Sequence, residues 1–337
     1  MSLHVLRNIC IFGALYTLVV ISVGAWVRLT DAGLGCPDWP GCYGILGTPN
    51  TDMELLRAQE LYPDAIIDTG KAWREMFHRY LAGILGIFVF YISYLTIKYA
   101  KHVSKIFPVT LFFLIIIQSL MGMLTVTELV KPTIVTTHLV LGMSTATLLL
   151  WNGLEVQRHK ILNLIDKKLV ILIVICIIGL IFQIILGGWT STNYASLACT
   201  DFPKCDNSWW PSNMDYKNGF TVFNLPNINY EQAPLIHNAK VAIHFTHRLG
   251  ALLLTTLYVY LFWYIFFKQS NVRIKTISSI ILGYFTLQII LGISNVIYSL
   301  PISIAVLHTV NASVVLMGMI TLLYLSLIHI SEPTRPY

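Results

Sequence analysis

The chain has 337 residues, of which 56% are hydrophobic and only 11% are charged, and its formal net charge is +6. This composition lies outside the range of soluble globular domains and indicates an integral membrane protein. The basic residues form no cluster with interleaved aromatic side chains, so the positive charge does not indicate a protein that binds nucleic acid.

Eight apolar segments are long enough to cross a bilayer as helices, which takes about 20 residues each. In chain order they lie near residues 8–29, 76–98, 106–127, 133–153, 169–190, 241–267, 274–298 and 302–327. The first segment is too long for a signal peptide and leads into Trp26-Val27-Arg28 without a small-residue cleavage site. The sequence therefore predicts an all-α integral membrane protein with eight transmembrane helices.

Lysine and arginine residues gather in alternate connections between these segments. They follow the second, fourth and sixth predicted helices: Lys98, Lys101 and Lys105, then Arg158, Lys160, Lys167 and Lys168, then Lys268, Arg273 and Lys275. The short connections on the other side contain a single basic residue, Lys131. Because basic residues near the ends of membrane helices stay in the cytoplasm, we expect both termini to be cytoplasmic.

Two long loops, about residues 30–75 and 190–240, are expected on the outer side and hold four of the six cysteines. The pattern C-x-D-[WF]-P-x-C occurs in each loop, as Cys36…Cys42 and Cys199…Cys205. On an oxidising face such pairs are typical of one disulfide per loop. Each disulfide would stabilise its loop by about 2–3 kcal/mol. A redox-active pair and a metal-binding pair stay open as alternatives.

The two halves of the sequence repeat one another. Matching residues are Trp26 and Trp189, Cys36 and Cys199, His78 and His247, Gln118 and Gln288, Gly122 and Gly292, and His138 and His308. The separation grows from 163 residues at the tryptophans to 169 at the first histidines, which indicates six extra residues in the second outer loop. We predict two four-helix bundles, residues 1–160 and 161–337, related by a pseudo-twofold axis along the membrane normal.

Four histidines, His78, His138, His247 and His308, fall near the outer ends of their predicted helices, at equivalent positions in the two halves. Two imidazoles at equal height on neighbouring helices can approach a plane from opposite sides, as in bis-histidine heme ligation. The sequence lacks the C-x-x-C-H motif of covalently attached heme. A hydrogen bond between helices is the alternative use of each imidazole, but the symmetric register of all four favours two cofactor sites.

The residues beside the first histidine of each pair differ between the halves. Glu75 lies three residues before His78 on the same helix face, and His244 stands at that position in the second half. We interpret Glu75 as an acid–base group that faces the first site, with an ion pair to a neighbouring arginine as the alternative. Arg79 and Arg248 suit heme propionates, or else extend toward lipid headgroups. This difference predicts a chemical role for the first site and an electron-transfer role for the other.

The run GAWVRLTDAGLGCPDWPGC at residues 24–42, the Glu75-x-x-His78-Arg79 motif and the histidines of the fourth, sixth and eighth predicted helices resemble the heme A synthases of the cysteine-containing bacterial type. The resemblance covers nearly the whole chain. It implies oxidation of the C8 methyl group of heme O to the formyl group of heme A, by successive hydroxylation, for cytochrome oxidase biogenesis.

Carried over residue by residue, the resemblance implies that His78 and His138 bind the iron of the substrate, heme O. It implies that His247 and His308 ligate the iron of a resident heme b, and that Glu75 is catalytic. It also implies a bacterial inner (plasma) membrane location and partnership with heme O synthase, with cytochrome oxidase assembly and with an electron donor that the sequence does not identify. A homo-oligomer stays open, and no nucleic-acid partner is expected.

Some residues have no role in this resemblance. His244 has none that can be transferred, and Gln118 and Gln288 are interpreted as amides that bond across helices. Residues 327–337 match nothing expected of the family, and His329 among them is not interpreted as a ligand.

Three other functions stay open from the sequence. A di-heme b-type cytochrome would pass electrons from quinol to a partner without altering the porphyrin. A non-heme di-metal oxidase is compatible with the spacings E-x-x-H and H-x-x-H. A transporter or heme chaperone would suit the repeat, although paired, interrupted helices are not evident.

Overall fold

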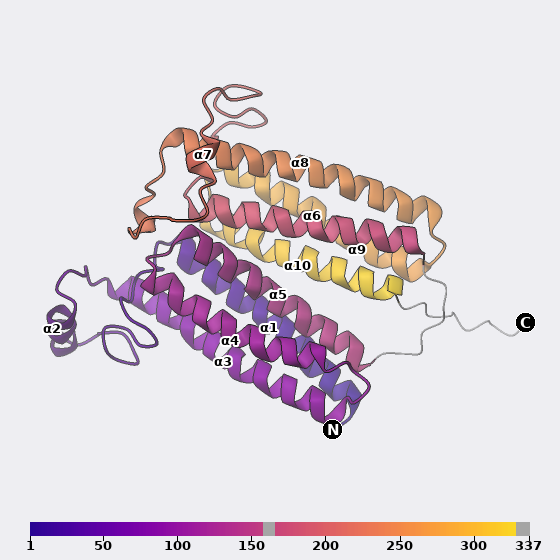
Figure 1. Cartoon of the computed structure of the whole chain (residues 1–337), viewed down its shortest axis with the longest axis horizontal. Coiled ribbons are helices and arrows are strands. Elements are labelled where there is room, and N and C mark those ends of the chain that lie inside the picture. Colours follow the sequence, from indigo (N-terminus) through magenta and orange to yellow (C-terminus); the bar gives the residue numbers. More distant parts are fainter. Residues whose placement is uncertain (158–165, 328–337) are drawn as a thin grey trace, which may run out of the picture.

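The structure, a computed structural model, describes residues 1–157 and 166–327, and within them it is all-helical, with two isolated β-bridges and no strand (Figure 1). Eight helices are long and apolar enough to span a membrane: α1 Leu3–Leu29, α3 Thr69–Tyr99, α4 Ile106–Thr127, α5 Pro132–Val156, α6 Lys167–Thr192, α8 His237–Lys268, α9 Val272–Ile297 and α10 Ile302–Leu327. The predicted eight-span, all-α membrane protein is confirmed.

The largest error in the predicted boundaries is the start of α3, which begins at Thr69 rather than near residue 76. The Asp68 side chain caps this helix by accepting the Lys71 amide at 2.9 Å. The first two turns carry Lys71, Arg74 and Glu75, whose charges mask the helix in a search for apolar runs. The helix therefore extends beyond the apolar segment toward the outer loops.

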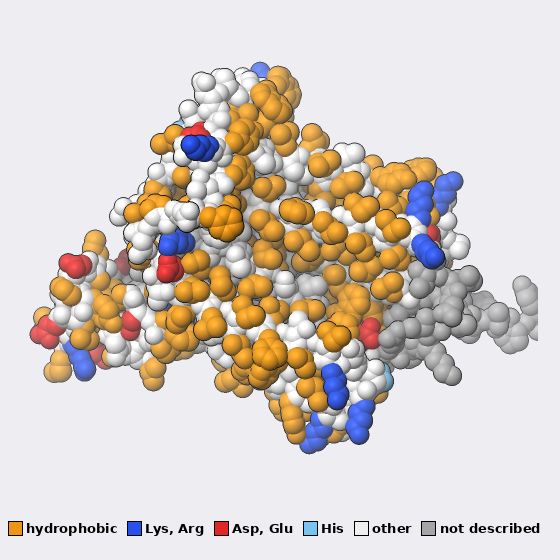
Figure 2. Space-filling view, viewed as in Figure 1, with side chains coloured by type: hydrophobic (Ala, Val, Ile, Leu, Met, Phe, Trp, Pro, Cys, Tyr) orange, Lys and Arg blue, Asp and Glu red, His pale blue; other side chains and the backbone are white. Residues whose placement is uncertain are grey.

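The surface agrees with a membrane span. In Figure 2 hydrophobic side chains cover the middle of the visible face, and lysines, arginines, aspartates and glutamates concentrate at its two ends. The end that carries the N-terminus shows mainly basic side chains, whereas the opposite end shows both signs (Figures 1 and 2). Two of the basic residues used to predict the orientation, Arg158 and Lys160, lie outside the described residues, as does His329.

Helices from each half of the chain pack mainly with one another. In the first half α1 and α4 each pack against α3 and α5, and in the second half α6 and α9 each pack against α8 and α10. The halves meet where α10 contacts α1 and α5 and where α5 contacts α6. The pairing of helices thus corresponds between the halves. The pseudo-twofold axis and the division into residues 1–160 and 161–337 stay predictions.

The apolar cores of the two halves are joined. Tyr258 of α8 is fully buried and stacks on Phe285 of α9 with ring centroids 4.2 Å apart. Met143 of α5 belongs to the same buried cluster, and Met317 of α10 belongs to the cluster of the first half. Because each cluster contains a side chain from the other half, displacement of one half would expose part of the apolar core of the other.

The outer loops contain short elements that the sequence analysis did not predict: α2 Asp52–Leu61, α7 Tyr216–Gly219 and the 3-10 turn η1 Tyr230–Gln232. Both loops lie at the same end of the molecule (Figure 1). Each contains the disulfide suggested by its cysteine spacing, Cys36–Cys42 with Cα atoms 4.8 Å apart and Cys199–Cys205 with Cα atoms 4.7 Å apart. Each outer loop therefore contains one short closed ring, residues 36–42 in the first and 199–205 in the second.

Candidate functional site

The four matched histidines lie on the second, fourth, sixth and eighth membrane-spanning helices, close to the outer loops. His78 belongs to α3, His138 to α5, His247 to α8 and His308 to α10. The side chains of His78 and His138 lie close enough to affect each other electrostatically, and so do those of His247 and His308. The structure thus brings together the two pairs that the sequence analysis grouped.

Each of these imidazoles packs against a glycine of a neighbouring helix. A Cβ added to the glycine would lie within 3.4 Å of the ring in every case: 2.8 Å for Gly24 and His78, 3.4 Å for Gly122 and His138, 3.2 Å for Gly187 and His247, and 3.1 Å for Gly292 and His308. The glycines lie on α1, α4, α6 and α9 and follow the sequence repeat. Each half therefore provides the same two spaces for an imidazole beside a helix backbone.

Glutamine amides fix three of the four histidines. Gln118 donates to the His138 carbonyl at 3.0 Å, and Gln288 donates to the His308 carbonyl at 3.0 Å, so the predicted use of these amides across helices is confirmed. In the second half Gln183 lies 3.0 Å from His247 Nδ1 and donates to the carbonyl of the same residue at 2.9 Å.

The first histidine of the first half has no such amide, because Val20 stands where Gln183 stands in the repeat. Within residues 1–157 and 166–327, Nδ1 of His78, of His138 and of His308 is buried and has no hydrogen-bond partner. A buried polar atom without a partner calls for a ligand or another explanation. All three nitrogens lie at glycine-lined positions, and two of them belong to the pair His78 and His138, which fits a prosthetic group held by two imidazoles.

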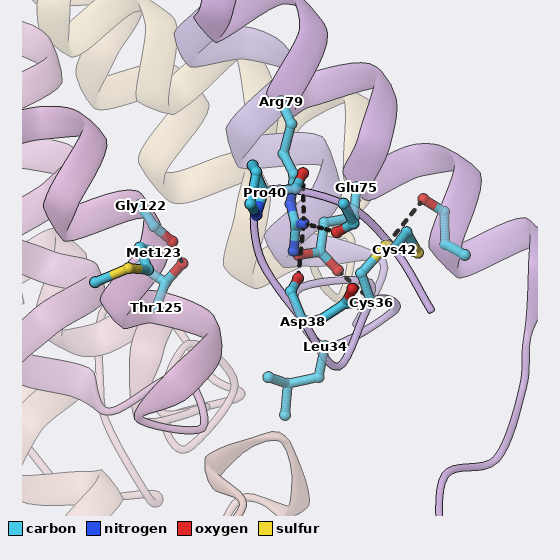
Figure 3. Close-up of polar contacts among 12 residues, drawn as sticks. Leu34, Cys36, Asp38, Pro40, Cys42, Glu75, Arg79, Gly122, Met123 and Thr125 are labelled. Carbon is cyan, nitrogen blue, oxygen red and sulfur yellow. Dashed lines mark hydrogen bonds and ion pairs between the residues drawn. A yellow bond between two sulfur atoms is a disulfide. The ribbon is translucent and has the colours of Figure 1, made fainter. Parts of the chain in front are cut away.

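Glu75 and Arg79 connect α3 to the first disulfide loop (Figure 3). Glu75 is 4% exposed, and its Oε2 accepts the Cys36 amide at 2.8 Å. Its Oε1 pairs with Arg79 Nη2 at 2.5 Å, so the ion pair that the sequence left open as an alternative is present. Arg79 also donates to the carbonyls of Asp38, Pro40 and Gly41. One carboxylate and one guanidinium thus hold the loop against the helix.

The second half has the same arrangement with a histidine in place of the glutamate. His244 is 4% exposed, and its Nδ1 accepts the Cys199 amide at 3.2 Å. Arg248 Nε lies 3.3 Å from His244 Nε2, and the Arg248 guanidinium donates to the carbonyls of Cys199, Asp201 and Lys204. His244, which had no assigned role, therefore anchors the second disulfide loop as Glu75 anchors the first.

The sequence matches the COX15-CtaA family of cytochrome oxidase assembly proteins over residues 7–320. The chain belongs to this family. It is 41% identical over 311 residues to the heme A synthase of Shewanella oneidensis, a match that covers 92% of this chain and 93% of the relative. The heme A synthases of Halalkalibacterium halodurans and Pelagibacter ubique are 26% and 27% identical to it, with 91% and 92% of this chain and 93% and 94% of the relatives covered.

The family's match spans both histidine pairs and both loop anchors. Among the described residues, no group of three or more His, Cys, Asp or Glu side chains is arranged to hold a metal ion. A bis-histidine heme needs only two protein ligands for its iron, because the porphyrin occupies the other positions. The paired imidazoles meet this requirement.

Sequence reasoning missed several residues of this site. Gly24 and Gly187 could have been found, since they match at the same separation as the tryptophans. Gln183 has no counterpart in the first half and gave no signal. The anchoring by His244 could not be predicted, because its partner is a backbone amide that only the folded loop brings close.

Proposed function

We propose that this chain is a heme A synthase that oxidises the C8 methyl group of heme O to the formyl group of heme A by successive hydroxylation. The proposal is supported by membership of the family and by the relative in Shewanella oneidensis. The observation that carries it is the pair of equivalent histidine sites, of which only the first has a buried carboxylate three residues away.

In this proposal His78 and His138 bind the heme O iron, so the substrate lies on the side of Glu75. His247 and His308 hold a resident heme b. When bound, that heme would supply one-electron transfer to or from the first site. Gln183 lies 3.0 Å from His247 Nδ1 and donates to the carbonyl of the same residue, so it fixes the place of His247 beside the proposed resident heme. Val20 stands at the matching position of the first half, so the first site lacks this glutamine, which suits a substrate that must enter and leave.

Glu75 is the proposed acid–base residue. Its two oxygens are held by the Cys36 amide and by Arg79, so the carboxylate has a fixed position at the outer end of α3. A carboxylate in a fixed position can accept a proton released in the reaction, or orient water at the reacting carbon, and pass the proton to the outer face. His244 fills the same structural place in the second half but supplies no carboxylate.

Arg79 and Arg248 are proposed to contribute positive charge near the heme propionates while their guanidinium groups hold the loops. We further propose that the protein is in the bacterial inner membrane with both termini in the cytoplasm, which places the disulfides on the oxidising side. Heme O synthase and the cytochrome oxidase assembly machinery are its proposed partners, and homo-oligomerisation is a further proposal.

The proposal is tested by chromatography of the hemes bound to the protein after expression with a source of heme O. Heme B together with heme O and its hydroxylated or formyl products is the expected result. Heme B alone would refute the proposal in favour of the di-heme cytochrome, to which the comparisons give no support. Protein without any heme would refute both functions.

A further inference from the structure

The outer loop of the second half docks on the first half beside the Glu75 site. Tyr230, in η1, is 4% exposed, and its amide donates to the Leu129 carbonyl in the connection between α4 and α5 at 3.3 Å. The next residue, Glu231, reaches the first disulfide loop: its Oε1 accepts the Leu34 amide at 3.2 Å. This hydrogen bond joins residues 197 positions apart.

Two carboxylates from different halves thus hold one short stretch of backbone. Glu231 accepts the amide of Leu34, and Glu75 accepts the amide of Cys36, two residues later. Between them Gly35 lies so close to α3 that an added Cβ would meet the Lys71 backbone at 2.5 Å. The stretch Leu34–Cys36 therefore has three successive restraints, and Figure 3 shows Leu34 at the edge of the network around Glu75.

A second contact across the halves supports this docking. Arg28, at the end of α1, donates to the Ser191 carbonyl at 2.6 Å and lies 4.1 Å from the centre of the Tyr194 ring. The Tyr194 hydroxyl donates to Asp31 at 2.6 Å, just before the restrained stretch. The start of the first disulfide loop is therefore fixed by the end of α6 as well as by Glu231.

Charge also connects Glu231 to this site. Glu231 lies within electrostatic range of Glu75, of Lys71 and of Arg28. Its side chain is partly buried, and this burial raises the pKa of Glu231, against the opposing effect of Lys71. A half-buried carboxylate directed at a backbone amide needs that hydrogen bond to offset the loss of water.

The arrangement is not repeated in the other direction. Leu197 corresponds to Leu34 in the repeat. Within residues 1–157 and 166–327 no carboxylate accepts its amide, and its side chain is 38% exposed. Only the half that contains Glu75 receives this bond from its neighbour.

We propose that Glu231 is a positioning residue for Glu75: from the second half it fixes residues 34–36, whose Cys36 amide in turn holds the Glu75 carboxylate. The inference rests on the proposed function, because positioning matters only if Glu75 takes part in the reaction. It explains why the second loop, with its six extra residues, reaches over the first half.

Three variants test the proposal. Glu231→Ala removes the acceptor of the Leu34 amide, whereas Glu231→Gln keeps an acceptor oxygen in the same place and removes the charge. Glu60→Ala is the control, since Glu60 is an exposed carboxylate of the first outer loop. Each purified protein is measured for hydrogen exchange of the peptide that contains residues 34–36, for kcat and KM with heme O, and for the absorption spectrum of the resident heme.

In Glu231→Ala we expect the Leu34 amide to exchange about tenfold faster and kcat to fall about tenfold, as for the loss of one ordinary hydrogen bond. KM for heme O and the resident heme spectrum should stay at their wild-type values. Glu231→Gln should restore both exchange and kcat to within about threefold of wild type, because its amide oxygen still accepts the Leu34 N–H.

The positioning role would be overturned by unchanged exchange in Glu231→Ala, or by faster exchange with unchanged kcat. A fall in kcat that Glu231→Gln does not reverse would also overturn it, because the charge and not the hydrogen bond would then matter. Failure of the proposed function is read separately, from the wild-type protein alone: if it forms no heme A, the function is refuted before any variant is compared.

Discussion

Replacing Gly24 by alanine is the most direct test of the histidine sites, because it adds one methyl group beside His78. The added Cβ would lie 2.8 Å from His78 Cε1 and 3.2 Å from Nε2. Protein atoms do not pack at the first of these distances, so the imidazole or α1 must move. Overpacking of this kind costs about 1–3 kcal/mol. If the cost falls on the bound state, heme O affinity drops by roughly 5- to 150-fold.

The assay compares heme O content, KM and kcat of Gly24→Ala with the absorption spectrum of the resident heme. We expect weaker heme O binding and an unchanged resident heme. Gly187→Ala should show the opposite pattern, because its Cβ would lie 3.2 Å from His247 Cε1. Gly83→Ala on α3 is the control: nothing lies within 4 Å of its added Cβ, so it removes a helical glycine without touching a histidine.

The distances also predict an order of effects within the first site. Gly122→Ala should disturb heme O binding less than Gly24→Ala, since its Cβ would lie 3.4 Å from His138, an ordinary contact. A Gly24→Ala protein with wild-type heme O affinity and turnover would refute the reasoning, because the substrate site could not then depend on where His78 lies.

Three further predictions concern the reaction, the loops and the end of the molecule opposite the disulfide loops. Glu75→Ala should keep the resident heme but lose heme O turnover, whereas His247→Ala should lose the resident heme spectrum; wild-type turnover in the first variant would remove the role of the carboxylate. Cys36→Ser or Cys42→Ser should lower the free energy of unfolding by about 2–3 kcal/mol, measured by thermal unfolding in detergent. Because the variant already lacks the first disulfide, a reductant should cause no further loss of stability at this loop. Asp166→Ala should cost about 1 kcal/mol by loss of the α6 cap. Burial raises the pKa of Asp166, but hydrogen bonds from the first amides of α6 and from two side chains at the end of α8 lower this pKa by a larger amount, so that the net shift is downward. Its contribution is therefore present at neutral pH and is lost as the pH falls below about 4, so the stabilities of variant and wild type should converge in acid.

The membrane fold could be predicted from the sequence because hydrocarbon demands long apolar helices, and length and composition alone reveal them. The prediction was poorest at α3, where the first two turns are charged, and in the outer loops, where α2 and η1 are short and polar. Outside the membrane, helix caps and turns determine the short elements, and these features leave weaker patterns in the sequence than long apolar runs do. The Thr51 and Glu54 capping box of α2 is such a signal.

The histidine pairs could also be predicted, because each histidine of one half has a matching histidine at the equivalent position of the other half. The contacts of Glu75 were harder, since its partners are the Cys36 amide, a backbone group, and Arg79, which itself is held by loop carbonyls. Helix periodicity gives the face on which Glu75 lies, but it says nothing about where a loop of the same half returns. Still less could it indicate Glu231, which arrives from the other half of the chain.

The two loop anchors explain how duplicated halves can differ in chemistry without differing in fold. Glu75 and His244 occupy one structural position: each is buried, each accepts the amide of the first cysteine of its loop, and each lies beside an arginine four residues later. A carboxylate and a neutral imidazole both supply the acceptor that the loop requires. The exchange of one for the other therefore leaves the disulfide loop in place. It changes only whether a carboxylate stands beside the histidine pair, so the half with Glu75 gains an acid–base group while the other half keeps the same architecture around its own pair of histidines.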